Sequence, residues 1–555
     1  MYSAEPLPHF VSQYLAWLHE THPTLATFDG VHTHDDHLDD LSRPAIDEAQ
    51  RRLNDFGRRL AAINPDTLTD DEQLDRPWLE LSIRARTYEL ETLRTWERNP
   101  HHYADLLAVS LASQALFDYA APAERARRMA SRLRQVPRLL QAARDNVRHP
   151  AGIFVRTAIE TLNGTIRFVD VELPRAFRTV DDLHVLSDLA DASAEAGTAL
   201  RRYAQYLQDE VAPKARGTFR LGEDRFESKL RFEEGIGLSA RQLLKIAERE
   251  LDATSEEFTR VASRLNGGDP IAAWQAMKDD HPEPGQLVRE VAGQLDDLRA
   301  FLADRDLVTI PEGDRLAVGP TPDFYRWTFA SLWSPGPFET RASLAHYYIT
   351  DVDPSWPADR QREHMRDCSR AMLWAISTHE AYPGHFLHFL HLRGIASPAR
   401  KSLMFASTSM VEGWAHYAEQ LMAEEGFGRD NPAIRLGQLA ESLVRLCRLI
   451  VGIRLHADDW SVEQGVRLFR ERAFLEEGSA RREAERGTFD PGYVSYALGK
   501  LMILKLRDDV KAMSPQSFSL KTFHDRLLGS SVFPLGFHRQ LMLGADAASP
   551  ASLLV

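Results

Sequence analysis

The side chains best suited to chemistry lie together in the stretch THEAYPGHFLH, residues 378–388. His379 and Glu380 are adjacent, and His385 follows six positions after the first histidine. Two neutral imidazoles can bind a divalent cation such as zinc, and a glutamate beside the first imidazole can act as general base on a metal-activated water. The segment therefore predicts a metal-dependent hydrolase. The alternative is a set of polar residues on a partly exposed helix.

The spacing of the two histidines differs from the ordinary HExxH pattern. Histidines four positions apart lie about 40° from superposition on a regular helix, whereas histidines six apart are about 120° from each other. Pro383 removes a helical hydrogen bond, and Gly384 can adopt backbone conformations that other residues avoid. We therefore expect a bulge at these two residues that brings His385 onto the helix face of His379.

A second group of ionisable residues occurs at helical spacing in VEGWAHYAE, residues 411–419. Glu412, His416 and Glu419 fall at positions i, i+4 and i+7, so they share one face of a mostly apolar helix. Burying them is costly unless they are paired or metal-bound. Glu412 fits as a third metal ligand supplied by a separate downstream helix, and His416 and Glu419 then orient a ligand or bind substrate. The alternative is a solvated helix face.

Helices must position these residues, because apolar side chains recur at spacings of three and four through most of the chain. Residues 123–147, 403–424, 434–455 and 493–510 are examples, and residues 342–351 form the best candidate strand. The sequence predicts a fold that is all-α or nearly so, with a small minor β element. A cluster of Pro and Gly suggests an N-terminal helical region, 1–215, and a C-terminal helical metal-site region, 216–555, packed as one catalytic unit.

Composition narrows the function classes. The formal net charge of −14 gives no general attraction to nucleic acid or to an anionic membrane surface, so we expect neither partner. Cys368 and Cys447 are the only cysteines, so any metal must be bound by His, Asp or Glu. The first residues lack the pattern of a secretory signal, and no apolar run reaches the roughly 18 residues of a membrane span. We expect a cytoplasmic protein. Nothing in the sequence indicates an oligomeric state.

Three segments carry a family resemblance. HEAYPGH, EGWAHYAEQL and DPGYVSYALGK resemble, in order and spacing, the signatures of the bacterial "domain of unknown function eight-eight-five" family, a zinc-peptidase-like group in the gluzincin superfamily. The segments PTLATFDG and LGEDRFESKLRFEEGIGLSARQLLKIAERELD extend the likeness over most of the chain. The family is distantly similar to helical metallocarboxypeptidases and oligopeptidases. The resemblance therefore implies a large multi-helix metallopeptidase-like fold with a central cleft.

The resemblance also implies roles for particular residues. It implies one zinc ion bound by His379, His385 and Glu412, with Glu380 as general base. It matches Tyr496 to a tyrosine that hydrogen-bonds the tetrahedral oxyanion. Arg486 matches a recurrent arginine that either pairs with a substrate carboxylate or forms a structural ion pair.

The chain departs from the family pattern at two places. Where the family often has PGHH, this chain has Phe386 in the second histidine's place and gains His388, which becomes the reserve metal ligand. A family stretch resembling R-x-V-V-D-T-G-x-H appears here as RLIVGIRLH, residues 448–456. Gly452 replaces its acidic residue and Arg454 its glycine. We expect this exchange to change the charge near the cleft, which affects substrate specificity more than metal binding.

These observations predict a zinc-dependent hydrolase that cleaves peptide or amide bonds in short peptides. Two alternatives stay open. One is a metal-dependent tailoring enzyme for a specialised amide or amino-acid-derived metabolite, suggested by the exchange at Gly452 and Arg454. The other is a non-catalytic helical binding protein that retains a metal site. Two imidazoles and one carboxylate also suit manganese or cobalt.

Overall fold

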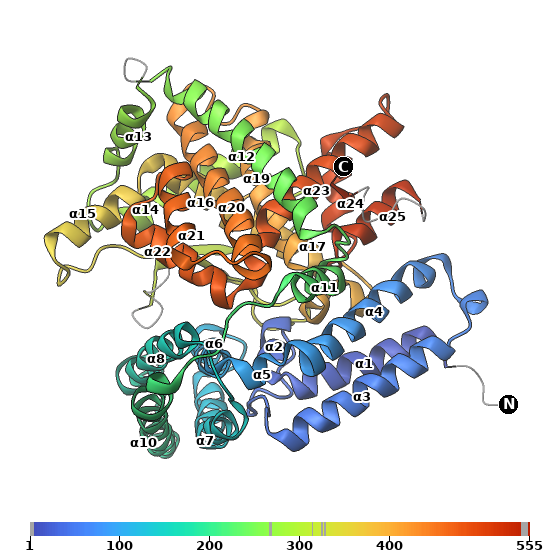
Figure 1. The fold of residues 1–555 in the computed structure, drawn as a ribbon, viewed down its shortest axis with the longest axis vertical. Coiled ribbons are helices and arrows are strands. Elements are labelled where there is room, and N and C mark those ends of the chain that lie inside the picture. Colours follow the sequence, from blue (N-terminus) through green and yellow to red (C-terminus); the bar gives the residue numbers. More distant parts are fainter. Residues whose placement is uncertain are drawn as a thin grey trace. The chain divides into compact units, whose positions relative to one another are not determined.

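The computed structural model describes residues 5–265, 269–313, 315–322, 326, 329–544 and 553–554, and most of them are helical. Figure 1 shows the helices in chain order. The chain divides into two compact units: the first comprises Met1–Phe219, Pro335–Ser343 and Ala396–Phe405, and the second comprises Arg220–Ser334, Leu344–Ile395 and Ala406–Val555. The first unit therefore continues four residues past the boundary expected near 215 and includes two short later segments.

Among its described residues, the first unit contains helices and loops but no strands. The amphipathic stripe expected in residues 123–147 is present, because α7 (Pro122–Asn146) buries Met129, Leu133, Val136, Leu139 and Leu140. This helix packs on α6 and α10. The helices of the unit are α1 (Leu7–Thr21), α2 (Pro23–Asp29), α3 (Arg43–Ala62), α4 (Asp70–Tyr88), α5 (Thr95–Arg98), α6 (Pro100–Leu116), α7 (Pro122–Asn146), α8 (Gly152–Arg167), α9 (Leu173–Ala176), α10 (Leu183–Tyr206) and α18 (Pro398–Lys401).

The second unit contains the remaining helices and the sheet. Helix α20 (Pro432–Ala457) is mostly buried and packs on α12, α16 and α22. The helices are α11 (Glu223–Glu234), α12 (Ala240–Ala262), α13 (Pro270–Asp279), α14 (Leu287–Arg305), α15 (Ala358–Asp367), α16 (Arg370–Glu380), α17 (His385–Arg393), α19 (Thr408–Glu424), α20 (Pro432–Ala457), α21 (Val462–Arg472), α22 (Glu477–Phe489), α23 (Ser495–Met513), α24 (Leu520–Leu528) and α25 (Leu535–Leu543).

The β element is one small sheet. Its strands are β1 (Leu316–Pro320), β2 (Ala330–Trp333) and β3 (Ala345–Ile349), in the order β1-β3-β2. β3 pairs parallel with β1 and antiparallel with β2, and it lies within the stretch predicted as a strand. The prediction of a nearly all-α fold with a minor β element is confirmed. Among the described helices, none is long and apolar enough to cross a membrane.

A close helix pair fixes the position of the candidate site. α19 and α23 pack tightly where Gly413 meets Gly499, and a Cβ on Gly413 would lie 2.5 Å from the Cα of Gly499. Only glycine at both positions permits this approach. The contact places Glu412, which precedes Gly413, and Tyr496, which lies one turn before Gly499, on neighbouring helices at the same level.

Candidate metal centre

The two histidines are brought together by a break between helices. α16 ends at Glu380 and α17 begins at His385, so the chain leaves the helix entirely for residues 381–384. The expected form, a bulge within one helix, is therefore wrong. The reason is local: Pro383 has no N–H, and the backbone folds so tightly at Gly384 that a Cβ there would lie 1.8 Å from the carbonyl oxygen of His379.

The connecting segment is held by hydrogen bonds at both ends of the break. Gly384 N–H donates to the carbonyl of Thr378 at 3.0 Å, and His388 N–H donates to the carbonyl of Gly384 at 3.1 Å. From α19, the indole N–H of Trp414 donates to the carbonyl of Pro383 at 2.8 Å. The helix that supplies Glu412 therefore also fixes the loop that positions the second histidine.

His379, His385 and Glu412 converge. Among the residues that the structure describes, one ligand atom from each of these three lies within 4.8 Å of the others. Oε2 of Glu412 is 3.4 Å from Nε2 of His379 and 3.3 Å from Nε2 of His385. The imidazole rings are nearly perpendicular, at 88°, with centroids 4.7 Å apart.

These separations fit a zinc ion. Ligand atoms at the usual zinc distances of about 2.0–2.1 Å and at tetrahedral angles are about 3.3 Å apart. Oε2 of Glu412 is buried and receives no hydrogen bond from the described residues, although two imidazole nitrogens lie close to it. A cation bound between this oxygen and the two nitrogens would satisfy all three ligand atoms at once. The donor set therefore fits one divalent ion.

The electrostatics of the three groups also favour a bound cation. Burial opposes the charged form of Glu412, but the His385 and His379 imidazoles outweigh it and hold the pKa of the carboxyl well below its usual range. Burial likewise opposes the charged form of His379, but Glu412 and Glu419 outweigh it and raise its pKa to about 9. The site favours positive charge between these groups. A divalent cation supplies that charge and displaces the proton.

Glu419 hydrogen-bonds the ligand His379 at Nδ1, the ring nitrogen that does not face Glu412. Its Oε1 accepts a hydrogen bond from Nδ1 of His379 at 2.8 Å and lies 3.3 Å from the guanidinium of Arg445, and its Oε2 lies 3.3 Å from Nδ1 of His416. Burial opposes its charged form, but Arg445 and His416 keep its pKa well below the usual range. The carboxylate therefore fixes the ring orientation of His379 and leaves Nε2 for the metal.

Arg445 is a site residue that the sequence reading missed. It lies on α20, within the apolar stretch recognised as helix, and only 8% of its surface is exposed. A charged residue at a buried helix position is the signal that could have identified it, because such a charge needs a partner.

Glu380 follows the ligand His379 directly in the chain, and Tyr496 lies near the His379 ring. Glu380 is partly exposed and makes no hydrogen bond or ion pair within the described chain, so its carboxylate is free. The Tyr496 ring stacks nearly parallel to that of His379, with centroids 6.5 Å apart. Burial, with the charge of Glu412, raises the pKa of Tyr496 to about 12 against the opposing Arg486 and Arg448. Its hydroxyl therefore keeps a proton to donate.

Arg486 forms a structural ion pair, the second of its two predicted roles, and it also contacts Tyr496. It donates to the Tyr496 hydroxyl oxygen at 3.4 Å and to Asp490 at 2.9 Å. The ion pair with Asp490 is structural, and it aims the guanidinium at the tyrosine. Because the hydroxyl oxygen accepts from Arg486, its hydrogen can point elsewhere.

His388, the reserve ligand, is not part of the ligand group. It is fully buried, and neither ring nitrogen has a hydrogen-bond partner among the described residues. Burial lowers the pKa of His388 well below its usual range, and the neighbouring His385, His391 and His538 lower it further. Its place on α17 is one turn after His385, and its ring atoms are not among the three that converge.

Gly452 and Arg454 lie outside the metal-ligand group, and the expected effect of their exchange on charge near the cleft and on specificity stays a prediction. A Cβ at Gly452 would lie 2.5 Å from a methyl of Val494, so glycine is required there for packing. Arg454 is partly exposed and pairs with Glu248 at 3.0 Å and with Asp458 at 2.6 Å, neither of which belongs to the centre. Its charge is neutralised locally.

Fold and site together define a nearly all-α protein with a candidate centre of two histidines and one glutamate. The model of the family described as "Bacterial protein of unknown function (DUF885)" matches residues 23–542, and the chain belongs to this family. Among curated proteins, none matches the sequence.

Solved structures share the fold. A "putative lipoprotein of unknown function" from Shewanella oneidensis is 24% identical, with a TM-score of 0.79 over 97% of this chain and 100% of the other. A "putative lipoprotein" from Colwellia psychrerythraea is 20% identical, with a TM-score of 0.79 over 95% of this chain and 97% of the other. At these identities the likeness establishes the architecture alone.

Proposed function

We propose that the protein is a zinc-dependent hydrolase of peptide or amide bonds in short peptides. The observation that supports it most is the convergence of His379, His385 and Glu412 around a buried carboxylate oxygen that lacks a hydrogen-bond donor. A zinc ion bound there supplies a Lewis acid for the substrate carbonyl and lowers the pKa of water.

The neighbouring side chains have the chemistry that hydrolysis needs. Glu380, adjacent to a ligand and free of partners among the described residues, accepts the proton of the attacking water and returns it to the leaving amine nitrogen. The protonated hydroxyl of Tyr496, held by Arg486, donates a hydrogen bond to the oxyanion that develops on the scissile carbonyl. Glu419 holds His379 in one tautomer.

The test separates metal binding from turnover. Purified wild type and Glu380→Gln are compared for zinc content by mass spectrometry and for cleavage of a library of short peptides. We expect about one zinc per chain in both proteins and a loss of cleavage of at least a hundredfold in the variant, because only the base is removed. Glu363→Gln, the same change at an exposed residue of α15, is the matched control. Undiminished cleavage by Glu380→Gln would contradict the mechanism.

The same experiment distinguishes the alternatives. Zinc bound by the wild type with no cleavage of any library peptide would favour a tailoring enzyme or a binding protein. The exchange at Gly452 and Arg454 is the feature that suggests the first of these, although Arg454 is paired with Glu248 and Asp458 and Gly452 is needed for packing. Wild-type protein that binds no zinc after reconstitution would contradict the proposal.

A further inference from the structure

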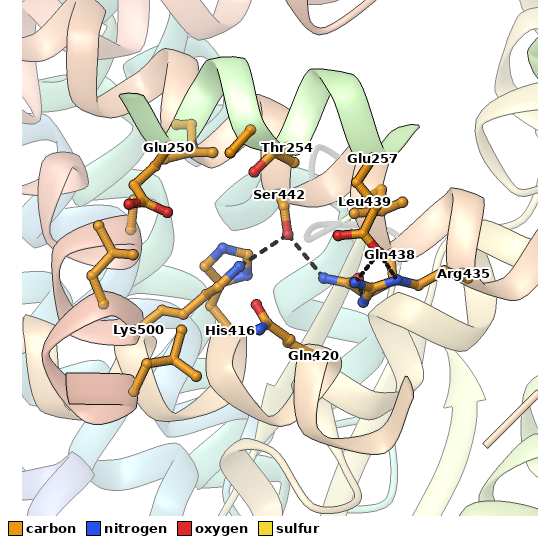
Figure 2. A pocket seen from close by; sticks show the side chains of 15 residues that line it. Glu250, Thr254, Glu257, His416, Gln420, Arg435, Gln438, Leu439, Ser442 and Lys500 are labelled. Atoms are coloured by element: carbon orange, nitrogen blue, oxygen red, sulfur yellow. Dashed lines mark hydrogen bonds and ion pairs between the residues drawn. The ribbon is translucent and has the colours of Figure 1, made fainter. Parts of the chain in front are cut away.

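A polar cavity lies in the same unit, and Glu419 connects its lining residue His416 to the metal ligand His379. Its volume is about 170 Å³, and side chains from α12, α19, α20 and α23 line it. Figure 2 shows Glu250 and Thr254 reaching in from α12, with Lys500 and His416 among the side chains around the space. Glu250 and Thr254 are partly exposed, so the cavity communicates with solvent.

One wall presents a buried hydrogen-bond acceptor with no donor. His416 is 1% exposed, and its Nδ1 faces the carboxylate of Glu419 at 3.3 Å. The carboxylate can only accept, so Nδ1 carries the proton and Nε2 is the acceptor. Burial and the charge of Lys500 lower the pKa of His416 to about 3, which keeps the ring neutral. Nε2 has no partner among the described residues, although the ring lines the cavity.

Beside it lies a buried cation without a carboxylate partner. Lys500 is 8% exposed, and its ammonium donates to Oγ of Ser442 at 3.2 Å. Glu419 and Glu424 act on it through space, but none of the ion pairs found within the described chain includes Lys500. Burial lowers the pKa of Lys500 to about 8, so most molecules carry the charge at neutral pH. An ammonium donates three hydrogen bonds, and burial without a counter-ion is costly.

A ligand that fits this cavity must therefore supply a carboxylate to Lys500 and an N–H donor to His416. It must also be small. The volume equals that of about six water molecules, which is enough for a solute with a handful of heavy atoms. Glu250 adds a carboxylate on the α12 side, where it also pairs with the exposed Arg249 at 2.9 Å. A compact zwitterion satisfies both Lys500 and His416.

We propose that this cavity binds a small α-amino acid, with its carboxylate on Lys500 and its ammonium on Nε2 of His416 and on Glu250. The site is independent of the proposed function, because it includes none of the metal ligands and needs no turnover. If the protein also removes terminal residues from peptides, the released amino acid is a ligand for this cavity.

The test measures binding by isothermal titration calorimetry. Glycine, L-alanine and L-serine are titrated into the purified protein, with acetate and methylamine as probes that carry only one of the two charges. We expect saturable 1:1 binding of an amino acid and at least tenfold weaker binding of acetate and methylamine. Lys500→Met should weaken amino-acid binding at least tenfold. Lys505→Met is the matched control, because Lys505 lies on the same helix and pairs with Asp509.

Two further variants make the result unambiguous. Amino acids can also bind zinc, so the titration is repeated with His385→Ala, which lacks a metal ligand. Binding retained in that variant supports the cavity as the site.

Thr254→Leu changes a partly exposed residue of α12 and fills the cavity, so it should abolish binding even if Lys500→Met folds poorly. The proposal is overturned by no binding to the wild type, by unchanged binding in both cavity variants, by binding lost in His385→Ala, or by acetate binding as tightly as glycine.

Discussion

Replacing Glu419 by glutamine tests how far the metal centre depends on the carboxylate behind His379. The change preserves shape but removes the charge and one acceptor oxygen. In the wild type, Glu419 accepts from Nδ1 of His379 at 2.8 Å and faces His416 and Arg445 at 3.3 Å. A glutamine amide presents one oxygen and one NH₂ group to these three donors, so at least one donor faces another donor.

The expected magnitude follows from these contacts. Loss of a partner that orients a metal-ligating histidine typically weakens metal affinity by about 10–100-fold, or about 1.4–2.7 kcal/mol. A buried group left without its hydrogen bond adds an expected loss of about 1–3 kcal/mol in the free energy of unfolding. Arg445 keeps a second carboxylate partner, Glu441, so the variant should still fold.

The assay is a competition for zinc between the protein and a chromophoric chelator near neutral pH, with circular dichroism as a check on folding. Glu441→Gln is the matched control, because Glu441 pairs with Arg445 but makes no contact with His379 among the described residues. Its zinc affinity should stay within about twofold of the wild type. Wild-type affinity in Glu419→Gln, or equal weakening in both variants, would refute the role of Glu419 in orienting His379.

Four other results are expected. Tyr496→Phe should lower kcat by about 10²–10³-fold with unchanged zinc content, measured on a cleaved peptide; an unaltered kcat would remove it from the mechanism. Cys368 and Cys447 are buried, and burial raises the pKa of both thiols, so neither should react with a thiol reagent until the protein unfolds. Gly413→Ala should destabilise the protein by about 1–3 kcal/mol in urea unfolding, because its Cβ would overlap α23. Amino-acid affinity should fall about tenfold per pH unit above about pH 8, as the Lys500 ammonium is lost; a flat calorimetric profile would contradict this. The charged groups around that ammonium are Glu419 and Glu424 on α19, Arg435 and Arg445 on α20, and Glu250 and Glu257 on α12.

Local sequence pattern predicts those features that depend on residues close in the chain. The three- and four-residue spacing of apolar side chains predicted the helices, because each helix buries one face. The spacing of Glu412, His416 and Glu419 placed them on one face of α19, and the structure has them there. Strands β1 and β2 were not predicted, because they are short and partly exposed along most of their length, without clear alternation.

Features that depend on contacts between distant segments were not predictable in this way. Arg445 and Lys500 lie in apolar helices, and only the fold shows that the first meets Glu419 and the second faces a cavity. The break between α16 and α17 at Gly384 also depends on distant contacts. Its geometry depends on the carbonyl of His379 and on a hydrogen bond from Trp414, which is some thirty residues later in the chain.

The arrangement along α19 predicts that the cavity and the metal centre influence each other. A ligand ammonium that donates to Nε2 of His416 makes its Nδ1–H a stronger donor to Glu419. Glu419 then offers less negative charge to His379, whose bond to a metal weakens. Because coupling between two sites is reciprocal, an amino acid should bind more tightly to metal-free wild type than to zinc-loaded protein, by a factor equal to its effect on zinc affinity. Equal calorimetric affinity in the two forms would show that Glu419 does not couple the sites.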